Sequence, residues 1–348
     1  CHHDRISGDC PAIEHILITK PKSAFEIDLR PEDAEFTGRA KIIKMSDVPS
    51  KKAIGFISHG SGSASFNFDA DEKGEYVLTF VFHKSMAKKK QYMQIHINGK
   101  MYEIFFPETK GFSPLGRQQI IVELKEGINN MTIKNPVATA IDSSYIQYKR
   151  MGNALKEASS MWAKVTHSEE KPITYSICEW GMARPYLWGA KAGSMWRTTP
   201  DITPNWKSIT MIYNRTLKLY KHSGPGHWND PDMLEVGNGK LDDNENRAHF
   251  SLWCMLAAPL MLGNDIRSFV SNGMPDKDNE TLKIVTNKHM IAVDQDSLGK
   301  SAKRIKKESG IDIIARPLSN GDVALCLFNT ASSTKSVNFK LDDLTKDP

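Results

Sequence analysis

The sequence predicts an α/β protein that contains half of a (β/α)8 TIM barrel, preceded by a β-sandwich and followed by the start of a C-terminal antiparallel β domain. Period-two alternation of apolar residues fills about residues 24–147. Strand-like and helical runs then alternate over about 148–264, at the pace of a barrel whose full circuit takes roughly 250 residues. Strand-like runs return from Ile311, and all seven Trp lie between Trp162 and Trp253.

The composition is that of a globular protein with two or three hydrophobic cores. Of the 348 residues, 40% are hydrophobic and 25% charged. The longest nearly unbroken apolar run, Leu252 to Gly263, has 12 residues, fewer than the roughly 20 of a membrane-spanning helix. The net charge of +5 is too small and too dispersed for a nucleic-acid binder. We therefore expect neither nucleic acid nor a membrane as a partner, and the sequence leaves the oligomeric state open.

The five cysteines are odd in number and widely scattered: Cys1, Cys10, Cys178, Cys254 and Cys326. No C-x2-C pair occurs, so the pattern does not indicate a zinc site. Cys254 lies inside the apolar run, and we expect it to be a buried small hydrophobic residue. The N-terminus lacks both an initiator Met and the apolar stretch of a signal peptide, so we expect the chain to begin within a longer protein.

The first region is predicted to be an antiparallel β-sandwich of roughly 120 residues. Apolar residues alternate over 63–68 and 76–82, and again at 95–97 and 120–124. Asn98-Gly99 between two such runs is a strong hairpin signal, and Lys73-Gly74 and Glu126-Gly127 mark further turns.

The second region is predicted to hold four strand–helix units. A helical stripe is formed by Met151, Ala154, Leu155 and Ala158. The strand candidates are Pro172–Trp180, a run leading into Trp196-Arg197, His227–Leu234 and Leu260–Asn264. Helices are expected over Trp206–Tyr220 and Asn246–Leu256. Strands are expected later at Ile311–Ala315, Val323–Phe328 and Val337–Leu341, with a turn at Asn320-Gly321.

Polar residues follow each strand candidate of the second region, where the active site of a (β/α)8 barrel gathers. They are Glu179 and Trp180, Arg197 and Asp201, Asp230 and Asp232, and Asn264 and Asp265. Paired carboxylates suit the cleavage of a glycosidic bond, with one as general acid and the other as nucleophile or base. The alternative is that they cap the following helices, although caps do not require clustered Trp and Arg.

Six motifs follow one another through this region. They are Cys178-Glu-Trp-Gly181, Trp196-Arg-Thr-Thr-Pro-Asp-Ile202, Gly224-Pro-Gly-His-Trp-Asn-Asp-Pro-Asp-Met-Leu234, His249-Phe-Ser-Leu-Trp253, Ala257-Ala-Pro-Leu-Met-Leu-Gly-Asn-Asp265 and Ile291-Ala-Val-Asp-Gln-Asp-Ser-Leu-Gly299. Their order closely resembles glycoside hydrolase family 27, the α-galactosidase and α-N-acetylgalactosaminidase family. The resemblance covers about Tyr148 to Leu327, and it implies a retaining, metal-independent hydrolase. It also implies that the half barrel is the second half of the (β/α)8 TIM barrel and that the β-sandwich is an insertion in this barrel.

The resemblance assigns roles to individual residues. It makes Asp201 the general acid/base and Arg197 a sugar-binding residue that steadies the charge on the paired carboxylates. Asp232 and Met233 are expected to line the sugar pocket, and Trp180 to contact the substrate. Asp230 lies nearer the strand and is expected to be structural.

Glu179 and Met182 bear on the choice of sugar. By the resemblance, Glu179 reads the sugar 2-hydroxyl and Met182 excludes a 2-acetamido group, which favours galactose over N-acetylgalactosamine. A site built for a hydroxyl discriminates strongly because a missing partner leaves buried polar groups unpaired. The alternative for Met182 is plain core packing.

The nucleophilic Asp of the family lies in a K-Y-D-x-C motif, and no such motif occurs in these residues. Cys1 fits as the last residue of that motif and is expected to border the substrate, which puts the nucleophile two residues before it. Without the nucleophile the chain would be inert, so a non-catalytic carbohydrate-binding protein stays open as an alternative. Cys178 has no Cys near 193–195 to pair with and is expected to be free. Residues 2–4 are expected to be an exposed loop flank rather than a metal site.

The sandwich resembles carbohydrate-binding modules of family 35 in four short stretches: Pro31–Ala40, Gly74–Leu78, Ile97–Gly99 and Leu124–Asn129. Such modules often hold calcium and bind sugars, which makes Glu32 and Glu35 weak candidates. The alternative is a spacer that shapes the rim of the active site. The predicted domains are residues 1–17 after barrel strand four, 18–147 for the sandwich, 148–303 for the half barrel and 304–348 for the C-terminal domain.

The predicted activity is that of an exo-acting α-galactosidase without a cofactor, acting on oligo- or polysaccharides with terminal α-galactosyl residues. β-L-Arabinopyranosidase and α-N-acetylgalactosaminidase stay open as sibling specificities. An extracytoplasmic location, secreted or periplasmic, is expected from the substrate.

Overall fold

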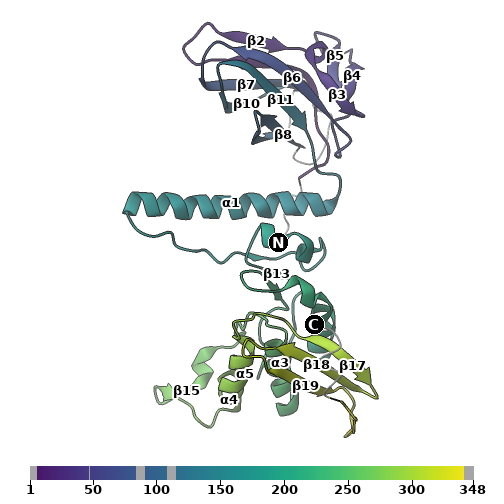
Figure 1. Ribbon diagram of the computed structural model, residues 1–348, viewed down its shortest axis with the longest axis vertical. Helices are drawn as coiled ribbons and strands as arrows, with labels where there is room; N and C mark the ends of the chain where they lie inside the picture. Colours follow the sequence, from purple (N-terminus) through teal and green to yellow (C-terminus); the bar gives the residue numbers. More distant parts are fainter. Residues whose placement is uncertain (1–5, 47, 84–90, 108–114, 341–348) are drawn as a thin grey trace. The chain divides into compact units, whose positions relative to one another are not determined.

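The computed structural model of this chain describes residues 6–46, 48–83, 91–107 and 115–340. The chain divides into two compact units, Cys1–Gln147 and Tyr148–Pro348, each of which is described by itself (Figure 1). Helix α1 (Ala140–Thr166) begins in the first unit and continues in the second.

The first unit is an antiparallel β-sandwich, as the alternation predicts. Its strands are β1 (Ala12–Thr19), β2 (Glu26–Leu29), β3 (Glu35–Gly38), β4 (Lys41–Lys44), β5 (Lys52–Gly55), β6 (Gly62–Ala70), β7 (Gly74–His83), β8 (Gln91–Ile97), β9 (Lys100–Phe106), β10 (Leu115–Leu124) and β11 (Gly127–Lys134). One sheet has the order β10-β7-β1-β5-β4 with β2 paired to β1, and the other has the order β3-β6-β11-β8-β9. Alternate side chains of the two sheets fill one apolar core, which includes the rings of Tyr76, Phe80, Phe82 and Phe106.

One of the three predicted turns joins neighbours within a sheet, and the other two join the sheets. Asn98-Gly99 makes the predicted hairpin between β8 and β9, and both residues have the positive φ that such a turn requires. At Lys73-Gly74 and at Glu126-Gly127 the chain instead leaves one sheet for the other. The sandwich therefore pairs strands that are distant in sequence.

The two ends of the sandwich are tied to each other. The buried side-chain amide of Asn135 donates to the carbonyl oxygens of residues 7–9, at 3.2, 3.0 and 3.2 Å. Ser143 Oγ donates to the carbonyl oxygen of Ile6 at 3.1 Å. The chain therefore enters and leaves the sandwich at one place.

The second unit contains parallel strands with helices between them, as predicted for the half barrel. Strands β12 (Ser176–Ile177), β13 (Met195–Arg197) and β14 (Trp228–Asp230) form a parallel sheet in that order, with β12 shorter than the predicted run. The fourth candidate contributes a single parallel bridge, between Leu234 and Leu262. The helices are α2 (Trp206–Thr216), α3 (Asp243–Met255), α4 (Glu280–Val285) and α5 (Lys288–Asp294).

The buried face of α1 differs from the predicted one. Met151 is 52% exposed and Ala154 and Ala158 are exposed, whereas Gly152 is buried. A Cβ at Gly152 would lie 2.0 Å from the carbonyl oxygen of Ala192, so the glycine lets the helix approach this backbone closely. Hydrophobic periodicity cannot detect a contact face that is marked by a residue without a side chain.

Antiparallel strands return after α5. A short hairpin of β15 (Val270–Ser271) and β16 (Met274–Pro275) precedes α4, and the last sheet contains β17 (Lys303–Glu308), β18 (Ile311–Pro317) and β19 (Val323–Asn329). The sequence does not predict β17, because its lysine-rich run contains Ile305 as its only apolar residue. The strand predicted at Val337–Leu341 is wrong over residues 337–340, and Leu341 lies outside the described residues.

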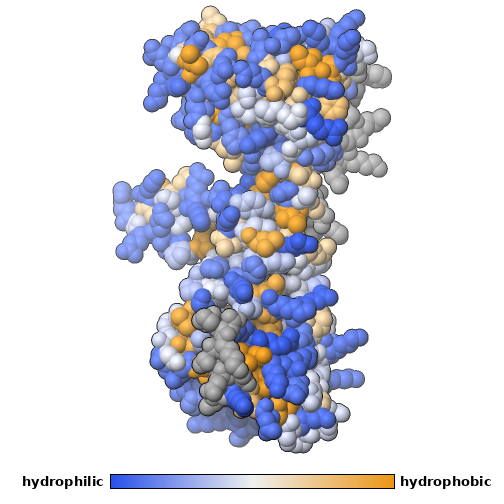
Figure 2. Space-filling model, turned by 45° about the vertical axis from the view of Figure 1, so that its right-hand side comes forward, coloured by the Kyte–Doolittle hydropathy of each residue, from blue (hydrophilic) through white to orange (hydrophobic). Residues whose placement is uncertain are grey.

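The face of the molecule in Figure 2 shows separate orange areas of apolar side chains in a mainly blue surface. Among the described residues of α1, Met161, Trp162 and Val165 are exposed apolar side chains. None of the helices that the structure describes is both long and apolar enough to cross a membrane.

Candidate active site

Four of the predicted site residues lie at or just beyond the carboxyl ends of β13 and β14. Arg197 ends β13 and Asp230 ends β14, and the two are partners in the parallel register. Asp201 and Asp232 follow these strands by four and two residues. Because parallel strands end at the same edge of their sheet, these four side chains come together.

Arg197 lies between two carboxylates. Its Nη2 is 3.0 Å from Asp201 Oδ1 and 2.5 Å from Asp232 Oδ2. The Arg197 and Asp232 side chains are 11% and 9% exposed, so water screens this ion pair only weakly. Arg197 Nε has no hydrogen-bond partner among the described residues, which leaves a buried donor available. One guanidinium thus sets the positions of both carboxylates.

Asp232 is held in a left-handed backbone conformation, with φ 82°. Such a conformation costs a non-glycine residue on the order of 1–3 kcal/mol, which the surroundings must offset. Its Oδ2 accepts a hydrogen bond from Ile202 N–H and its Oδ1 one from Met233 N–H, both at 2.8 Å. The Asp232 carboxylate is therefore fixed by backbone donors as well as by Arg197.

Asp230 braces the same loop from inside. Its Oδ1 accepts from Asp232 N–H at 2.8 Å, and its carbonyl oxygen accepts from Thr198 N–H at 2.9 Å. Burial raises the pKa of Asp230, while the hydrogen bond from Asp232 and the charge of Arg197 act in the opposite direction. This geometry favours a structural role over substrate contact.

Asp201 differs from these two carboxylates because it is open to solvent. Its side chain is 67% exposed and is held through the Arg197 guanidinium. An exposed carboxyl group beside a buried cation can reach a substrate oxygen and exchange a proton with it, as a general acid requires. Asp232 is fixed and Asp201 is accessible, so the two carboxylates suit different tasks.

The loop after β12 supplies an apolar rim. Trp180 and Gly181 have φ 53° and 75°, and a Cβ at Gly181 would lie 2.2 Å from the carbonyl oxygen of Thr198. This close packing leaves Trp180 38% and Met182 67% exposed. Within the described residues, Met182 is therefore not part of a core.

Glu179 and Met233 are the two remaining described residues that the sequence predicts to bind the substrate. Glu179 is half-buried in the loop after β12, and its charge adds to burial in raising the pKa of Tyr148. The Tyr148 hydroxyl donates to the carbonyl oxygen of Cys178 at 2.9 Å and so anchors the start of that loop. Met233 is 42% exposed next to the fixed Asp232.

Asn264 and Asp265, which follow the fourth strand candidate, make hydrogen bonds that stabilise the local backbone. Asn264 Nδ2 donates to the carbonyl oxygen of Val236 at 2.8 Å, and Asp265 accepts from Arg267 N–H at 3.0 Å and pairs with its guanidinium. The capping alternative is thus correct for Asp265. Cys1, predicted to border the substrate, lies outside the described residues.

Two buried residues of α3 belong to the site: they begin and end the motif His249-Phe-Ser-Leu-Trp253, to which the sequence analysis assigns no role. His249 and Trp253 are fully buried. Trp253 Nε1 donates to the carbonyl oxygen of Asp232 at 2.8 Å, and His249 Nε2 accepts from Glu235 N–H at 2.9 Å. Their i, i+4 spacing is a sequence signal for a shared helix face, but such a pair is typical of any core.

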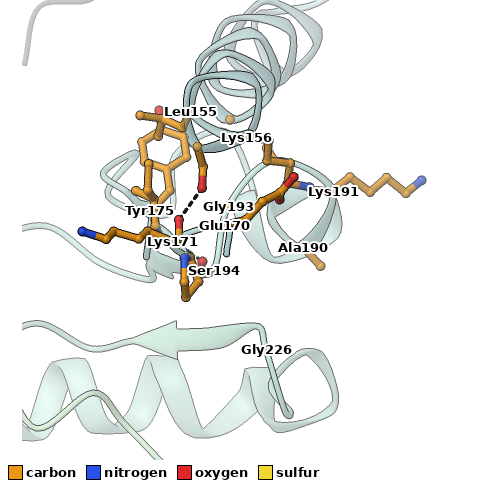
Figure 3. Close-up of a pocket in the computed structure, with 15 residues that line it drawn as sticks. Leu155, Lys156, Glu170, Lys171, Tyr175, Ala190, Lys191, Gly193, Ser194 and Gly226 are labelled. Carbon is orange, nitrogen blue, oxygen red and sulfur yellow. Dashed lines mark hydrogen bonds between the residues drawn. The ribbon is translucent and has the colours of Figure 1, made fainter. Parts of the chain in front are cut away.

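A separate cavity of about 570 Å³ lies at the opposite, amino ends of the parallel strands. It is lined by α1 and by segments that precede β12, β13 and β14, the last of them including Gly226. Figure 3 shows Leu155 and Tyr175 together on one side, and Ser159 Oγ donates to the carbonyl oxygen of Lys171 at 2.5 Å. None of the site carboxylates lines this cavity, so it is not the candidate active site.

Within the described residues, no three His, Cys, Asp or Glu side chains are placed to hold a metal ion. In the sandwich, Glu32 pairs with Lys52 at 2.5 Å and Glu35 is exposed on β3, so calcium there is not supported. The described cysteines, Cys10, Cys178, Cys254 and Cys326, are free, and Cys254 is fully buried, as predicted.

Comparisons with known proteins give two family matches and relatives in the same family. Residues 137–296 match the family described as alpha galactosidase A, and residues 308–347 match the alpha galactosidase C-terminal beta sandwich domain. The α-galactosidase of Cyamopsis tetragonoloba is 40% identical over 203 residues, which cover 58% of this chain and 47% of that protein. The solved α-galactosidase of Saccharomyces cerevisiae has a TM-score of 0.50 at 29% identity, covering 60% of this chain and 49% of its own. The chain spans about half the length of the curated relatives it matches.

The two family matches leave residues 1–136 of the first unit uncovered. A family 35 carbohydrate-binding module from Clostridium thermocellum covers 31% of this chain at 18% identity and a TM-score of 0.28. That similarity is too low to support an argument. The family of the sandwich and the four domain boundaries therefore stay predictions.

Proposed function

This chain belongs to the α-galactosidase family, glycoside hydrolase family 27, and on that premise we propose that the protein is a retaining exo-α-galactosidase. Its substrates are oligo- or polysaccharides with terminal α-linked galactose. The observation that carries this proposal is the Arg197 guanidinium, which holds Asp201 and Asp232 together at the carboxyl ends of neighbouring parallel strands.

Asp201 is proposed as the general acid and then the general base. In the first step it gives its proton to the glycosidic oxygen while a nucleophilic carboxylate attacks the sugar C1 from the opposite face. In the second step it removes a proton from water, which attacks C1 and releases galactose with retained configuration. We place the nucleophilic Asp two residues before Cys1, so the described residues supply one of the two carboxyl groups.

Arg197 and Asp232 bind and orient the sugar in this proposal. The positive charge of Arg197, 3.0 Å from Asp201, stabilises the carboxylate that forms when the proton leaves. Asp232 accepts a hydrogen bond from a sugar hydroxyl with the lone pairs that its backbone donors leave free. Trp180 and Met233 are exposed and, in this proposal, offer apolar surface to the C–H faces of the ring.

Glu179 and Met182 set the choice of sugar. Glu179 is half-buried and accepts the 2-hydroxyl of galactose, while the exposed Met182 occupies the space that a 2-acetamido group needs. We therefore propose galactose over N-acetylgalactosamine. Comparable rates on the nitrophenyl glycosides of both sugars would contradict this, and activity confined to the β-L-arabinopyranoside would assign the sibling specificity.

The central test is Asp201→Asn in the full-length protein, with Asp265→Asn as its matched control. Hydrolysis of an α-galactoside with a poor leaving group, such as raffinose, should fall about 10²–10⁴-fold, because the asparagine cannot donate a proton. Asp265 is also an exposed aspartate, after the fourth strand candidate, and it pairs with Arg267, so its variant should keep the wild-type rate. An Asp201→Asn enzyme with an unchanged rate would show that the acid is another residue.

The location and the sandwich complete the proposal. The substrate class supports an extracytoplasmic site of action, and cell fractionation tests it. The sandwich is proposed as a carbohydrate-binding module, and binding of galactan or uronate polysaccharides to residues 6–147 in affinity electrophoresis would distinguish it from a spacer.

A further inference from the structure

We propose that His249 and Trp253 are positioning residues: together they form an α3 clamp that holds residues 232–235, and with them the Asp232 carboxylate, in the geometry that binds substrate. The kinetic part of this inference rests on the proposed function, but its structural part does not.

The α3 clamp contacts the segment after β14 at both ends. Trp253 donates its indole N–H to the carbonyl oxygen of Asp232 at 2.8 Å. His249, one helical turn earlier, accepts the N–H of Glu235 at 2.9 Å. Two side chains of one buried helix face therefore fix a segment of four residues from its first carbonyl to its last amide.

The two side chains also fix each other. The rings of His249 and Trp253 meet edge to face, with centroids 4.2 Å apart and planes at 90°. His249 can accept from Glu235 only as the neutral imidazole, and burial lowers the pKa of His249 to about 3, which keeps it neutral at the pH of most assays. The acceptor is thus present whenever the protein is folded near neutral pH.

The segment needs such a restraint because it begins with a strained residue. Asp232 has φ 82°, and its carboxylate is joined to Ile202 N–H, Met233 N–H and Arg197. Relaxation of this backbone would rotate the carboxylate and move Arg197, which also holds Asp201. The Trp253 hydrogen bond acts on the peptide unit that carries the strain.

The first test is Trp253→Phe in the full-length protein, which removes the indole N–H and keeps a buried ring. Asp232 is proposed to touch the sugar in both the ground state and the transition state, so KM for an α-galactoside should rise about tenfold while kcat stays within about threefold. Tyr213→Phe on α2 is the matched control. It deletes another buried donor, the Tyr213 hydroxyl, which donates to Asp312 at 2.9 Å. It should lower stability and leave KM unchanged.

Conservative rescue separates positioning from packing at His249. His249→Gln keeps an acceptor near the place of Nε2, whereas His249→Leu keeps volume and loses the acceptor. The Gln variant should show a smaller rise in KM than the Leu variant. Equal values for the two would contradict the role of the Glu235 hydrogen bond.

Hydrogen exchange tests the α3 clamp without reference to activity. In Trp253→Phe, the amides of Ile202 and Met233, which donate to Asp232, should exchange at least about tenfold faster, and those of β13 should not change. If the wild-type protein does not hydrolyse α-galactosides, the proposed function fails and the exchange rates alone decide the inference. Unchanged exchange at both amides, with KM no higher than in Tyr213→Phe, would overturn it.

Discussion

The two units of this chain bury charge very differently. Among the described residues of the first unit, Glu14 is the single buried carboxylate or cation. Among the described residues of the second unit, six Asp, His and Arg side chains are buried: Arg197, Asp232, His249, Asp294, Asp312 and Arg316. A buried charge costs free energy unless it is paired and hydrogen-bonded, and apolar residues of similar volume often stabilise as well or better. The difference indicates that the second unit fixes polar groups in place, whereas the sandwich mainly maximises apolar contact.

One spectroscopic property makes this comparison measurable. All seven Trp of the sequence lie between Trp162 and Trp253, in the second unit. Tryptophan fluorescence therefore follows unfolding of the second unit without a direct contribution from the sandwich.

The largest expected effect is that of Asp312→Ala. Asp312 is fully buried and accepts from Arg304 Nε at 2.6 Å and from the Tyr213 hydroxyl at 2.9 Å. Its removal leaves the partly buried Arg304 cation unpaired, so the free energy of unfolding of the second unit should fall by about 3 kcal/mol, measured by urea denaturation with Trp fluorescence. Glu123→Ala breaks an exposed pair with Lys100 in the sandwich and should shift no transition measurably. Equal losses of unfolding free energy in the two variants would contradict the conclusion that the two units differ in their buried charges.

A smaller effect, with a definite pH dependence, is expected for Asp294→Asn. Burial raises the pKa of Asp294 to about 6, above the ordinary value near 3.9. The folded state thus binds this proton more tightly than the unfolded state, so the Asp294 contribution to stability rises as pH falls from about 7 to about 4. The variant, which has no charge to bury, should be more stable than the wild type at pH 7 by about 2 kcal/mol, and this advantage should shrink toward pH 4.

The stability of Asp294→Asn must be compared with that of the wild type at each pH, because His249 also changes the pH dependence of the wild-type stability. Its pKa is lowered to about 3 by burial, so its contribution to stability is lost as pH falls below about 6.5. The two groups have opposite signs over the same range and partly cancel in the wild type. A difference between variant and wild type that does not change with pH would contradict the raised pKa of Asp294.

The smallest effect is expected in the sandwich, for Ile54→Val. Ile54 is 1% exposed in the apolar core, and the loss of one methylene should lower the stability of the first unit by about 1 kcal/mol. Scanning calorimetry should detect this shift while the Trp fluorescence transition stays in place. A Trp transition that moves equally would show that the two units unfold together.

The sequence predicts most of the fold, because apolar patterning reflects burial. Alternation at 76–82 locates β7, and the strand ends at Arg197 and Asp230 locate the site. Patterning is silent where contacts use no apolar side chain: Gly152 marks the buried face of α1, and β17 is lysine-rich. It also misleads for Val337–Leu341, whose alternating residues lack a partner strand over the described 337–340.

The candidate site is predictable only in part. The spacing of Arg197 and Asp201 after one strand places their ion pair, but no pattern shows that Arg197 also binds Asp232, since that contact depends on the φ of 82° at Asp232. The contacts of Trp253 and His249 go to backbone atoms, which carry no sequence signal of their own. Motifs thus identify the reacting side chains, and the structure identifies what holds them.

The tie between the two ends of the sandwich has an evolutionary consequence. Asn135 joins residues 7–9 to the last strand, and Ser143 reaches Ile6, so about 130 residues begin and end within hydrogen-bonding distance of each other. A module with adjacent ends can be inserted into a surface loop of another fold without distorting that fold, because the two sides of the loop need to be only a short distance apart. The same adjacency allows the module to be lost or exchanged by recombination without disturbing the fold of the flanking segments.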